Sequence, residues 1–324
     1  MKLALRILGL TAAAALLGAL PAAAQKTVNV TSIHGMDSPQ AQVWVRFQEV
    51  LDKEIPGKVK INIIAGGVVG GEREEAEQIR LGSIQGSLST LANLSAWVPE
   101  GQLFDVPFMF RGEDHINRVM SGPIGDDMKA KYQAKGFRVL GFITYGARNL
   151  LSKKEVKAPA DVKGLRMRVI QSPLHIELWK SLGTNPTAVP ITEAYNALQT
   201  GVVDMMDFTK SGYAQMKLYE VTPYFVNTDH IWALGVMYFG EPFWQSLPAD
   251  EKAAFQKAAD ASIPHFNALA KQDHEKSIAE ATAKGAKLVT VDQSAWQKAM
   301  EPFWATFAPK VGGMERIQAV VNTK

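Results

Sequence analysis

The stretch GLRMRVIQSPLHIELWKSLGTNPTAVPITEAYNALQTGVVDMMD, residues 164–207, contains two strand-and-helix signals in succession. In its first part, apolar residues alternate with Arg166 and Arg168, which is the period-two pattern of a strand with two different faces. Ser172 and Pro173 follow as an N-cap residue and a proline suited to the first helical position. Arg168 is therefore expected near the carboxyl end of a strand, directly before a helix.

This position of Arg168 favours the binding of an anion. In open α/β sheets, ligands bind outside the carboxyl ends of the strands, where the positive end of the next helix also attracts negative charge. A planar guanidinium can form two parallel hydrogen bonds with a carboxylate. Arg166 is on the same face but further from the helix start, so we expect it to form a salt bridge.

A second helix is predicted to begin at Thr192 as N-cap and to end at Gly201, after which Val202 restarts a strand. That strand leads to Asp207 and Phe208. Asp207 would be unfavourable to bury unpaired, so its partner is expected to be Arg148, Arg168, a ligand donor or a metal. Phe208 is either a core residue or part of the wall around a ligand.

The rest of the chain alternates between strand and helix signals, which predicts an α/β fold. Strands are expected at 28–33, 59–64, 137–145, 224–239 and, as an edge strand, 288–291. Helices are expected at 38–53, 72–81 and 248–284, with Pro264 as a kink or break in the last. The strand at 137–145 leads directly into Arg148, and the long apolar segment at 224–239 can return the chain to the first part. Two such crossings predict two lobes joined by a hinge.

Motifs spread over nearly the whole chain follow one another in a specific order. They are KVKINIIAGGVVGGERE (58–74), FDVPFMF (104–110), GARNLLS (146–152), GLRMRV (164–169), ALQTGVVD (197–204) and YFVNTDH (224–230). In this order the chain resembles the extracytoplasmic solute-binding proteins of tripartite ATP-independent periplasmic (TRAP) transporters, the DctP family. The resemblance implies a two-lobed periplasmic binding protein fold, a clamp with hinge-crossing segments and a long C-terminal helical region.

The same resemblance implies a function and its residues. A cleft arginine that matches Arg168 grips the ligand carboxylate, and one that matches Arg148 often assists. From their positions in the chain, in the loop at 93–101 and in the returning segment, Trp97 and Trp232 are candidates either for the cleft wall or for aromatic packing at the hinge. The expected lobes are 25–146 with about 231–273, and 147–230 with about 274–324. The expected partners are a small organic anion and the small and large integral membrane subunits of a TRAP transporter, driven by an ion gradient.

One position departs from the resemblance. Many members have an acid, an asparagine and a proline where this chain has Asp207, Phe208 and Thr209. The missing asparagine argues against sialic acid and C4-dicarboxylates as ligands. Phe208 resembles a branch in which an aromatic ring packs against the ligand.

Composition and the N-terminus bound the class of protein. Residues 1–24 have a basic start, an apolar run and a small-residue cleavage site, which predicts a signal peptide and a periplasmic location. Loss of Lys2 and Arg6 with that segment leaves 33 basic and 32 acidic residues, a balance that does not favour nucleic-acid binding. The chain has no cysteine, and its hydrophobic content of 47% supplies an ample core.

An enzyme is the alternative interpretation: a secreted hydrolase or isomerase acting on a small organic acid, with Asp207 and His175 or His230 as acid and base. The residue types alone favour it. The sequence lacks the GxSxG, SxxK and HExxH motifs, and neither a histidine-based zinc site nor a cofactor is expected. A receptor that catalyses no reaction is the principal expectation.

Overall fold

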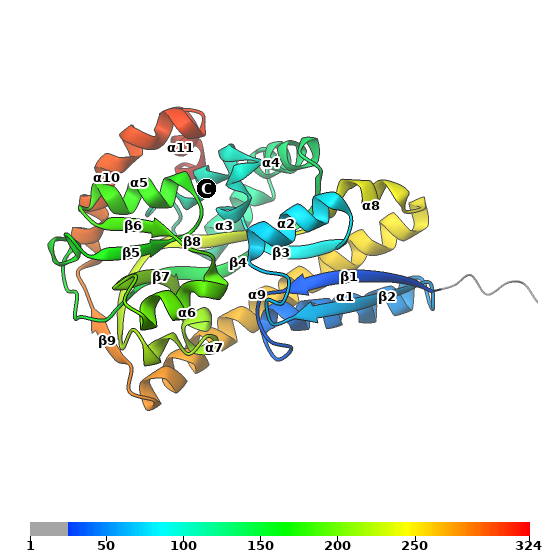
Figure 1. Ribbon diagram of the computed structural model, residues 1–324. Coiled ribbons are helices and arrows are strands. Elements are labelled where there is room, and N and C mark those ends of the chain that lie inside the picture. Colours follow the sequence, from blue (N-terminus) through cyan, green and yellow to red (C-terminus); the bar gives the residue numbers. More distant parts are fainter. Residues whose placement is uncertain (1–24) are drawn as a thin grey trace, which may run out of the picture.

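The computed structural model describes residues 25–324, so the predicted signal peptide lies outside the described residues. Within this range, one mixed sheet has the strand order β2-β1-β3-β8-β4-β7-β5-β6, with β9 beside β8 (Figure 1). The strands are β1 Lys26–Ser32, β2 Val59–Ala65, β3 Gly86–Thr90, β4 Phe137–Ser152, β5 Arg166–Val169, β6 Asn185–Ala188, β7 Met205–Thr209, β8 Tyr224–Gly240 and β9 Lys287–Thr290.

Two long antiparallel strands, β4 and β8, belong to both halves of the sheet. The last part of β8 pairs with β3, which continues to β1 and β2. The last part of β4 pairs with β7, which continues to β5 and β6. The predicted two-lobed α/β fold is confirmed, with β4 and β8 as the connecting segments. The boundaries near residues 146 and 230 stay predictions.

Helices cover both halves of the sheet (Figure 1). They are α1 Pro39–Glu54, α2 Glu72–Leu81, α3 Glu113–Met120, α4 Pro123–Ala134, α5 Pro173–Ser181, α6 Ile191–Gln199, α7 Lys210–Gln215, α8 Glu241–Ser246, α9 Ala249–Ala283, α10 Gln293–Phe307 and α11 Met314–Val321. Short 3-10 helices are η1 Asn93–Ala96, η2 Pro99–Asp105, η3 Pro159–Val162, η4 Leu218–Glu220 and η5 Ala308–Val311.

Helix α9 runs along both lobes, packing against α1 at one end and α7 at the other (Figure 1). It is continuous over 35 residues, with Pro264 inside it, so the helix does not break there, and a kink at Pro264 stays a prediction. At the α1 end, Phe47 and Phe255 meet edge to face with their ring centroids 5.5 Å apart. Such aromatic pairs add to the apolar burial that holds the helix on the sheet.

The C-terminal helices bridge elements from both halves. Helix α10 packs against α5 and β8, and its Trp304 Nε1 donates a hydrogen bond to Pro107 O at 2.9 Å. In α11, Val321 O accepts from the Arg111 guanidinium. This segment therefore ties the loop before α3 to the α5 side of the molecule.

Candidate ligand-binding site

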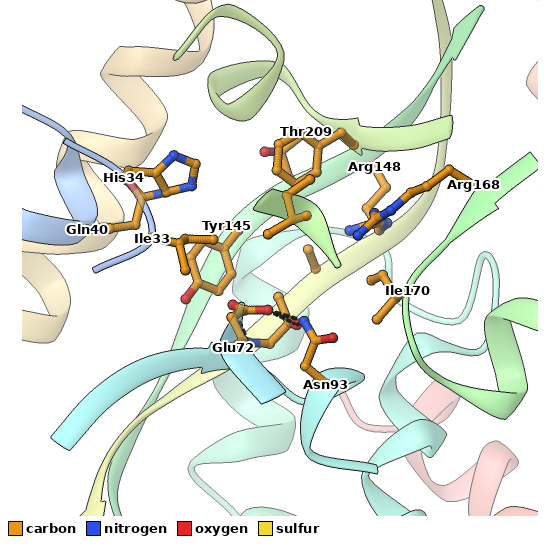
Figure 2. A pocket seen from close by; sticks show the side chains of 14 residues that line it. Ile33, His34, Gln40, Glu72, Asn93, Tyr145, Arg148, Arg168, Ile170 and Thr209 are labelled. Atoms are coloured by element: carbon orange, nitrogen blue, oxygen red, sulfur yellow. Dashed lines mark hydrogen bonds between the residues drawn. The ribbon is translucent and has the colours of Figure 1, made fainter. Parts of the chain in front are cut away.

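A small cavity lies where the two halves of the sheet meet, with a volume of about 30 Å³. Its walls come from the segment after β1 and from α1, α2, β3, η1, β4, β5, α6, β7 and β8. The lining residues are Ile33, His34, Gln40, Glu72, Thr90, Asn93, Tyr145, Arg148, Arg168, Ile170, Ile191, Phe208, Thr209 and Ala233. Figure 2 shows Arg148 and Arg168 on one side of this cavity and His34 and Gln40 on the opposite side.

Arg168 lies near the end of β5, with its side chain in the cavity wall (Figure 2). The residue is 3% exposed, and its Nε donates to Val189 O at 2.8 Å. Within the described part of the chain, Arg168 belongs to no ion pair. Burial, reinforced by the nearby Arg148 charge, lowers the pKa of Arg168 to about 10, so the guanidinium is still charged at neutral pH. A buried cation without a paired anion favours binding of an anionic ligand.

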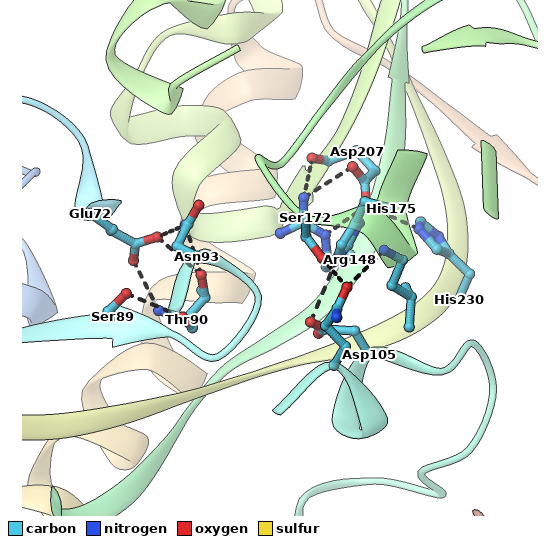
Figure 3. Close-up of polar contacts among 12 residues, drawn as sticks. Glu72, Ser89, Thr90, Asn93, Asp105, Arg148, Ser172, His175, Asp207 and His230 are labelled. Atoms are coloured by element: carbon cyan, nitrogen blue, oxygen red, sulfur yellow. Dashed lines mark hydrogen bonds and ion pairs between the residues drawn. The ribbon is translucent and has the colours of Figure 1, made fainter. Parts of the chain in front are cut away.

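Arg148 and Asp207 form a buried ion pair directly beside the cavity (Figure 3). The Arg148 Nε lies 2.6 Å from Asp207 Oδ2, and Nη2 lies 3.0 Å from Oδ1. Burial alone would raise the pKa of Asp207, but the Arg148 charge and hydrogen bonds from His230 and Arg148 outweigh it and hold that pKa well below the ordinary range. Of the partners expected for Asp207, the structure therefore selects Arg148.

Two buried histidines stand behind this pair, away from the cavity. His230 Nε2 lies 3.2 Å from Asp207 Oδ2, and His230 Nδ1 lies 2.8 Å from Thr228 Oγ1. His175 Nε2 lies 3.6 Å from Asp105 Oδ2. Asp207, His175 and His230 are fully buried, and none of them lines the cavity. The geometry gives no support to the acid and base roles of the enzyme interpretation.

Glu72 is a site residue that the sequence reasoning missed. It begins α2 after the glycine-rich turn at 66–71, and its carboxylate accepts hydrogen bonds from Thr90 N at 3.1 Å and Thr90 Oγ1 at 3.0 Å, and from Asn93 Nδ2. Burial raises the pKa of Glu72, while these hydrogen bonds and Arg148 oppose the rise. The GGERE motif, a turn leading into a helix, was the available signal.

His34 and Gln40 were also missed, and both lie across the cavity from the arginines (Figure 2). Burial lowers the pKa of His34 to about 4, against the opposing charge of Asp273, so the ring is neutral at physiological pH. Gln40 is 7% exposed, and its Oε1 is buried without a hydrogen-bond partner. His34 and Gln40 therefore add polar groups to the cavity wall that the arginine motifs of the sequence did not predict.

Of the three aromatic candidates, only Phe208 lies in the cavity wall. Phe208 lines the cavity, with the Arg148 Cζ 5.9 Å from its ring centroid. Trp97 does not line the cavity; its ring packs edge to face on that of Phe137, with the ring centroids 5.5 Å apart. Trp232 is also outside it, in the wall of a different, charged cavity of about 520 Å³ beside α3 and α9. Arg166 forms the expected salt bridge, with its Nη2 2.6 Å from Asp204 Oδ1.

Two searches concern residues 25–324 only. In that range, no group of three or more histidine, aspartate or glutamate side chains is arranged to hold a metal ion. Nor does that part of the chain include a helix with the length and apolar character that crossing a membrane requires.

A sheet in two halves, joined by long strands around a cavity lined by a cation that is buried and, among residues 25–324, in no ion pair, is the architecture of a two-lobed solute-binding protein. Residues 30–310 match the family of bacterial extracellular solute-binding proteins, family 7 (DctP), and the chain belongs to that family. A solute-binding protein of Verminephrobacter eiseniae is 30% identical, covering 92% of this chain and 90% of its own length.

Two solved structures support the same assignment. A TRAP periplasmic solute-binding protein of Sulfurospirillum deleyianum, with bound succinate, is 29% identical with a TM-score of 0.88, covering 93% of this chain and 100% of its own. One of Polaromonas sp. JS666, bound to D-erythronate, is 27% identical with a TM-score of 0.89, covering 93% and 99%. The predicted membership of the TRAP solute-binding proteins is confirmed.

Proposed function

We propose that this protein is an extracytoplasmic receptor that binds a small organic acid between its lobes and delivers it to a TRAP-type permease for uptake driven by an ion gradient. The observation that carries the proposal is the buried Arg168 guanidinium, which lines the cavity and has no carboxylate partner within residues 25–324. Succinate and D-erythronate, the ligands of the two related structures, share a carboxylate group.

The binding chemistry follows from the two arginines. The charge of Arg148 is already neutralised by Asp207. Arg168 therefore supplies the positive charge for the ligand carboxylate, and Arg148 assists from the same side of the cavity. The Arg168 Nε is held by Val189 O, which leaves the two terminal nitrogens to form a bidentate contact with the ligand carboxylate. Phe208 covers an apolar part of the ligand. Arg168, Arg148 and Phe208 are therefore our proposed ligand contacts, and Asp207 acts through its ion pair with Arg148. Trp97 and Trp232 lie outside the cavity lining and are not proposed to contact the ligand.

The proposed partners are the small and large integral membrane subunits of a TRAP transporter, and the proposed location is the periplasm. The description of both related structures as TRAP periplasmic proteins supports these assignments. We further propose that the protein changes no bond in its ligand. A compound released from the denatured protein is then expected to be chemically unchanged, whereas turnover of that compound would favour the enzyme interpretation.

The first test is substitution of the free cation. We expect Arg168→Ala to weaken carboxylate binding by roughly 2 to 5 kcal/mol, because the ligand charge is left unpaired in a buried site. Isothermal titration calorimetry measures the change, with a ligand found by a thermal-shift screen of mono- and dicarboxylates.

Arg166→Ala is the matched control, because it removes an arginine from the same strand whose side chain is exposed and paired with Asp204. We expect this variant to bind as the wild type does. Retention of wild-type affinity by Arg168→Ala would show that the carboxylate binds elsewhere.

A further inference from the structure

Glu72 is a buried acid inside the cavity. It is 7% exposed and lines the same space as Arg168. No ion pair within residues 25–324 includes it, although an acidic side chain is rarely buried without a cation. The three hydrogen bonds from Thr90 and Asn93 hold its carboxylate in place instead (Figure 3).

These contacts leave Glu72 one free acceptor position. Its Oε1 accepts one hydrogen bond, from Thr90 N, and its Oε2 accepts two, from Thr90 Oγ1 and Asn93 Nδ2. A carboxylate oxygen has two lone pairs, so Oε2 is saturated and Oε1 can accept one more donor. Because all three protein groups donate to it, the carboxylate acts here as an acceptor.

Opposite the arginines, the described residues that line the cavity include neutral polar groups and no lysine or arginine. Gln40 Oε1 is a second buried acceptor in the wall with no partner in the described chain, and the His34 ring beside it is neutral. The arginines lie on the other side of the cavity (Figure 2). A ligand that satisfies both Arg168 and Glu72 has an anionic group at one end and a hydrogen-bond donor at the other.

We propose that the cleft selects hydroxylated monocarboxylates over dicarboxylates, with Arg168 binding the carboxylate and Glu72 accepting a hydrogen bond from a ligand hydroxyl. This inference rests on the proposed receptor function and deepens it. A second carboxylate would face the Glu72 charge across a water-poor space, and like charges facing each other strongly disfavour a partner. The hydroxyl group satisfies the free acceptor and adds no charge.

Matched pairs of acids test the proposal. D-Erythronate and meso-tartrate share their carbon chain and configuration and differ in one terminal group, a primary alcohol or a carboxylate. D-Gluconate and D-glucarate form a longer pair of the same kind. For wild type we expect the monoacid of at least one pair to bind about 10-fold or more tightly than its diacid, as measured by calorimetry.

The variant Glu72→Gln tests whether this side chain causes the preference for the monoacid over the diacid. The amide keeps the size of the side chain, removes the charge and adds a donor, so we expect the preference for the monoacid to fall by about 10-fold. Glu77→Gln removes the same charge from an exposed side chain of the same helix and is expected to leave the preference unchanged. Circular dichroism melts establish that both variants are folded.

The outcomes separate this inference from the receptor function. An unchanged preference in Glu72→Gln, or a wild type that binds meso-tartrate and D-glucarate as well as the monoacids, overturns the selectivity assigned to Glu72. Absence of binding by both hydroxy acids, while other carboxylates bind through Arg168, also overturns it and leaves the receptor function standing. Carboxylate binding that survives Arg168→Ala overturns the receptor site.

Discussion

The two arginines of β5 show how position within one strand decides the environment of a side chain. Arg166 and Arg168 are two residues apart, so the strand period places them on the same face. Arg166 at the start of the strand is exposed and paired with Asp204. Arg168 near its end is buried beside the cavity. The charge is the same in both, and only the second is available to a ligand inside the molecule.

At the residue scale, the Arg148 and Asp207 pair supports a prediction about stability. We expect Asp207→Asn to lower the free energy of unfolding by about 3 to 5 kcal/mol, because it leaves Arg148 buried without its counter-charge. Urea denaturation measures this change.

The double variant Arg148→Leu with Asp207→Leu removes both charges and is expected to be less destabilised than Asp207→Asn alone. A single variant as stable as the wild type would show that Arg148 has another partner or is hydrated. A carboxylate held by Arg148 is a poor proton acceptor. A large loss of stability in Asp207→Asn would therefore also argue against Asp207 as an acid or base.

At the element scale, local patterns predicted most strands and the helices α1, α2, α5, α6 and α9. Ser38, the predicted first residue of α1, is its N-cap and accepts a hydrogen bond from Ala41 N at 3.2 Å, and α2 has the predicted bounds. Helix α6 begins at Ile191 after Pro190, so Thr192 lies inside the helix and the predicted N-cap was wrong. Strand β4 continues past Tyr145 to Ser152, because the register shift after Thr144 lets it pair with β7 beyond the bulge.

The start of α5 depends on a distant residue. Ser172 precedes the helix as predicted, but its side chain does not cap it. Gln102, in η2, does so instead, since its Oε1 accepts from Leu174 N at 2.8 Å and from Ser172 Oγ at 3.0 Å. This amide therefore joins η2 to the helix that follows the Arg168 strand.

We expect Gln102→Ala to lower the free energy of unfolding by about 1 to 2 kcal/mol, the usual effect of losing a helix cap. Ligand dissociation is expected to become faster, because the helix beside Arg168 loses a contact with η2; stopped-flow measurements report this rate. Gln133→Ala is an exposed control in α4, where the amide is 3.4 Å from Glu241. Equal effects of the two variants would contradict a capping role for Gln102.

At the scale of the whole molecule, β4 belongs to both halves of the sheet, and the predicted crossing between the lobes falls at Gly146. The backbone φ of Gly146 is 91°, a left-handed value that glycine adopts without strain. A Cβ there would lie 2.1 Å from His274 Cε1 on α9. His274 Nε2 lies 2.9 Å from Tyr145 O, so the long helix and the crossing strand are held together at this point.

We expect Gly146→Ala to destabilise the protein by several kcal/mol and to weaken ligand binding, because both the backbone strain and the clash with His274 disturb the hinge. Gly136→Ala is a close control, since Gly136 has the same φ of 91° and its added Cβ would contact nothing within 4 Å. That variant is expected to lose only about 1 kcal/mol, the strain contribution. Thermal unfolding and calorimetry compare the two, and equal losses would rule out a role for the His274 contact.

Short-range patterns were sufficient for most strands, for several helix starts and for an arginine in the cavity wall, because strand alternation and helix punctuation act over a few residues. They could not show that Arg148 would neutralise Asp207, or that Glu72, His34 and Gln40 would come to lie across the cavity from Arg168. Residue 72 is far from residue 168 along the chain, and the crossing strands bring the two together. The balance of charge in the site follows from that long-range packing, which determines which buried groups neutralise one another and which are left for a ligand.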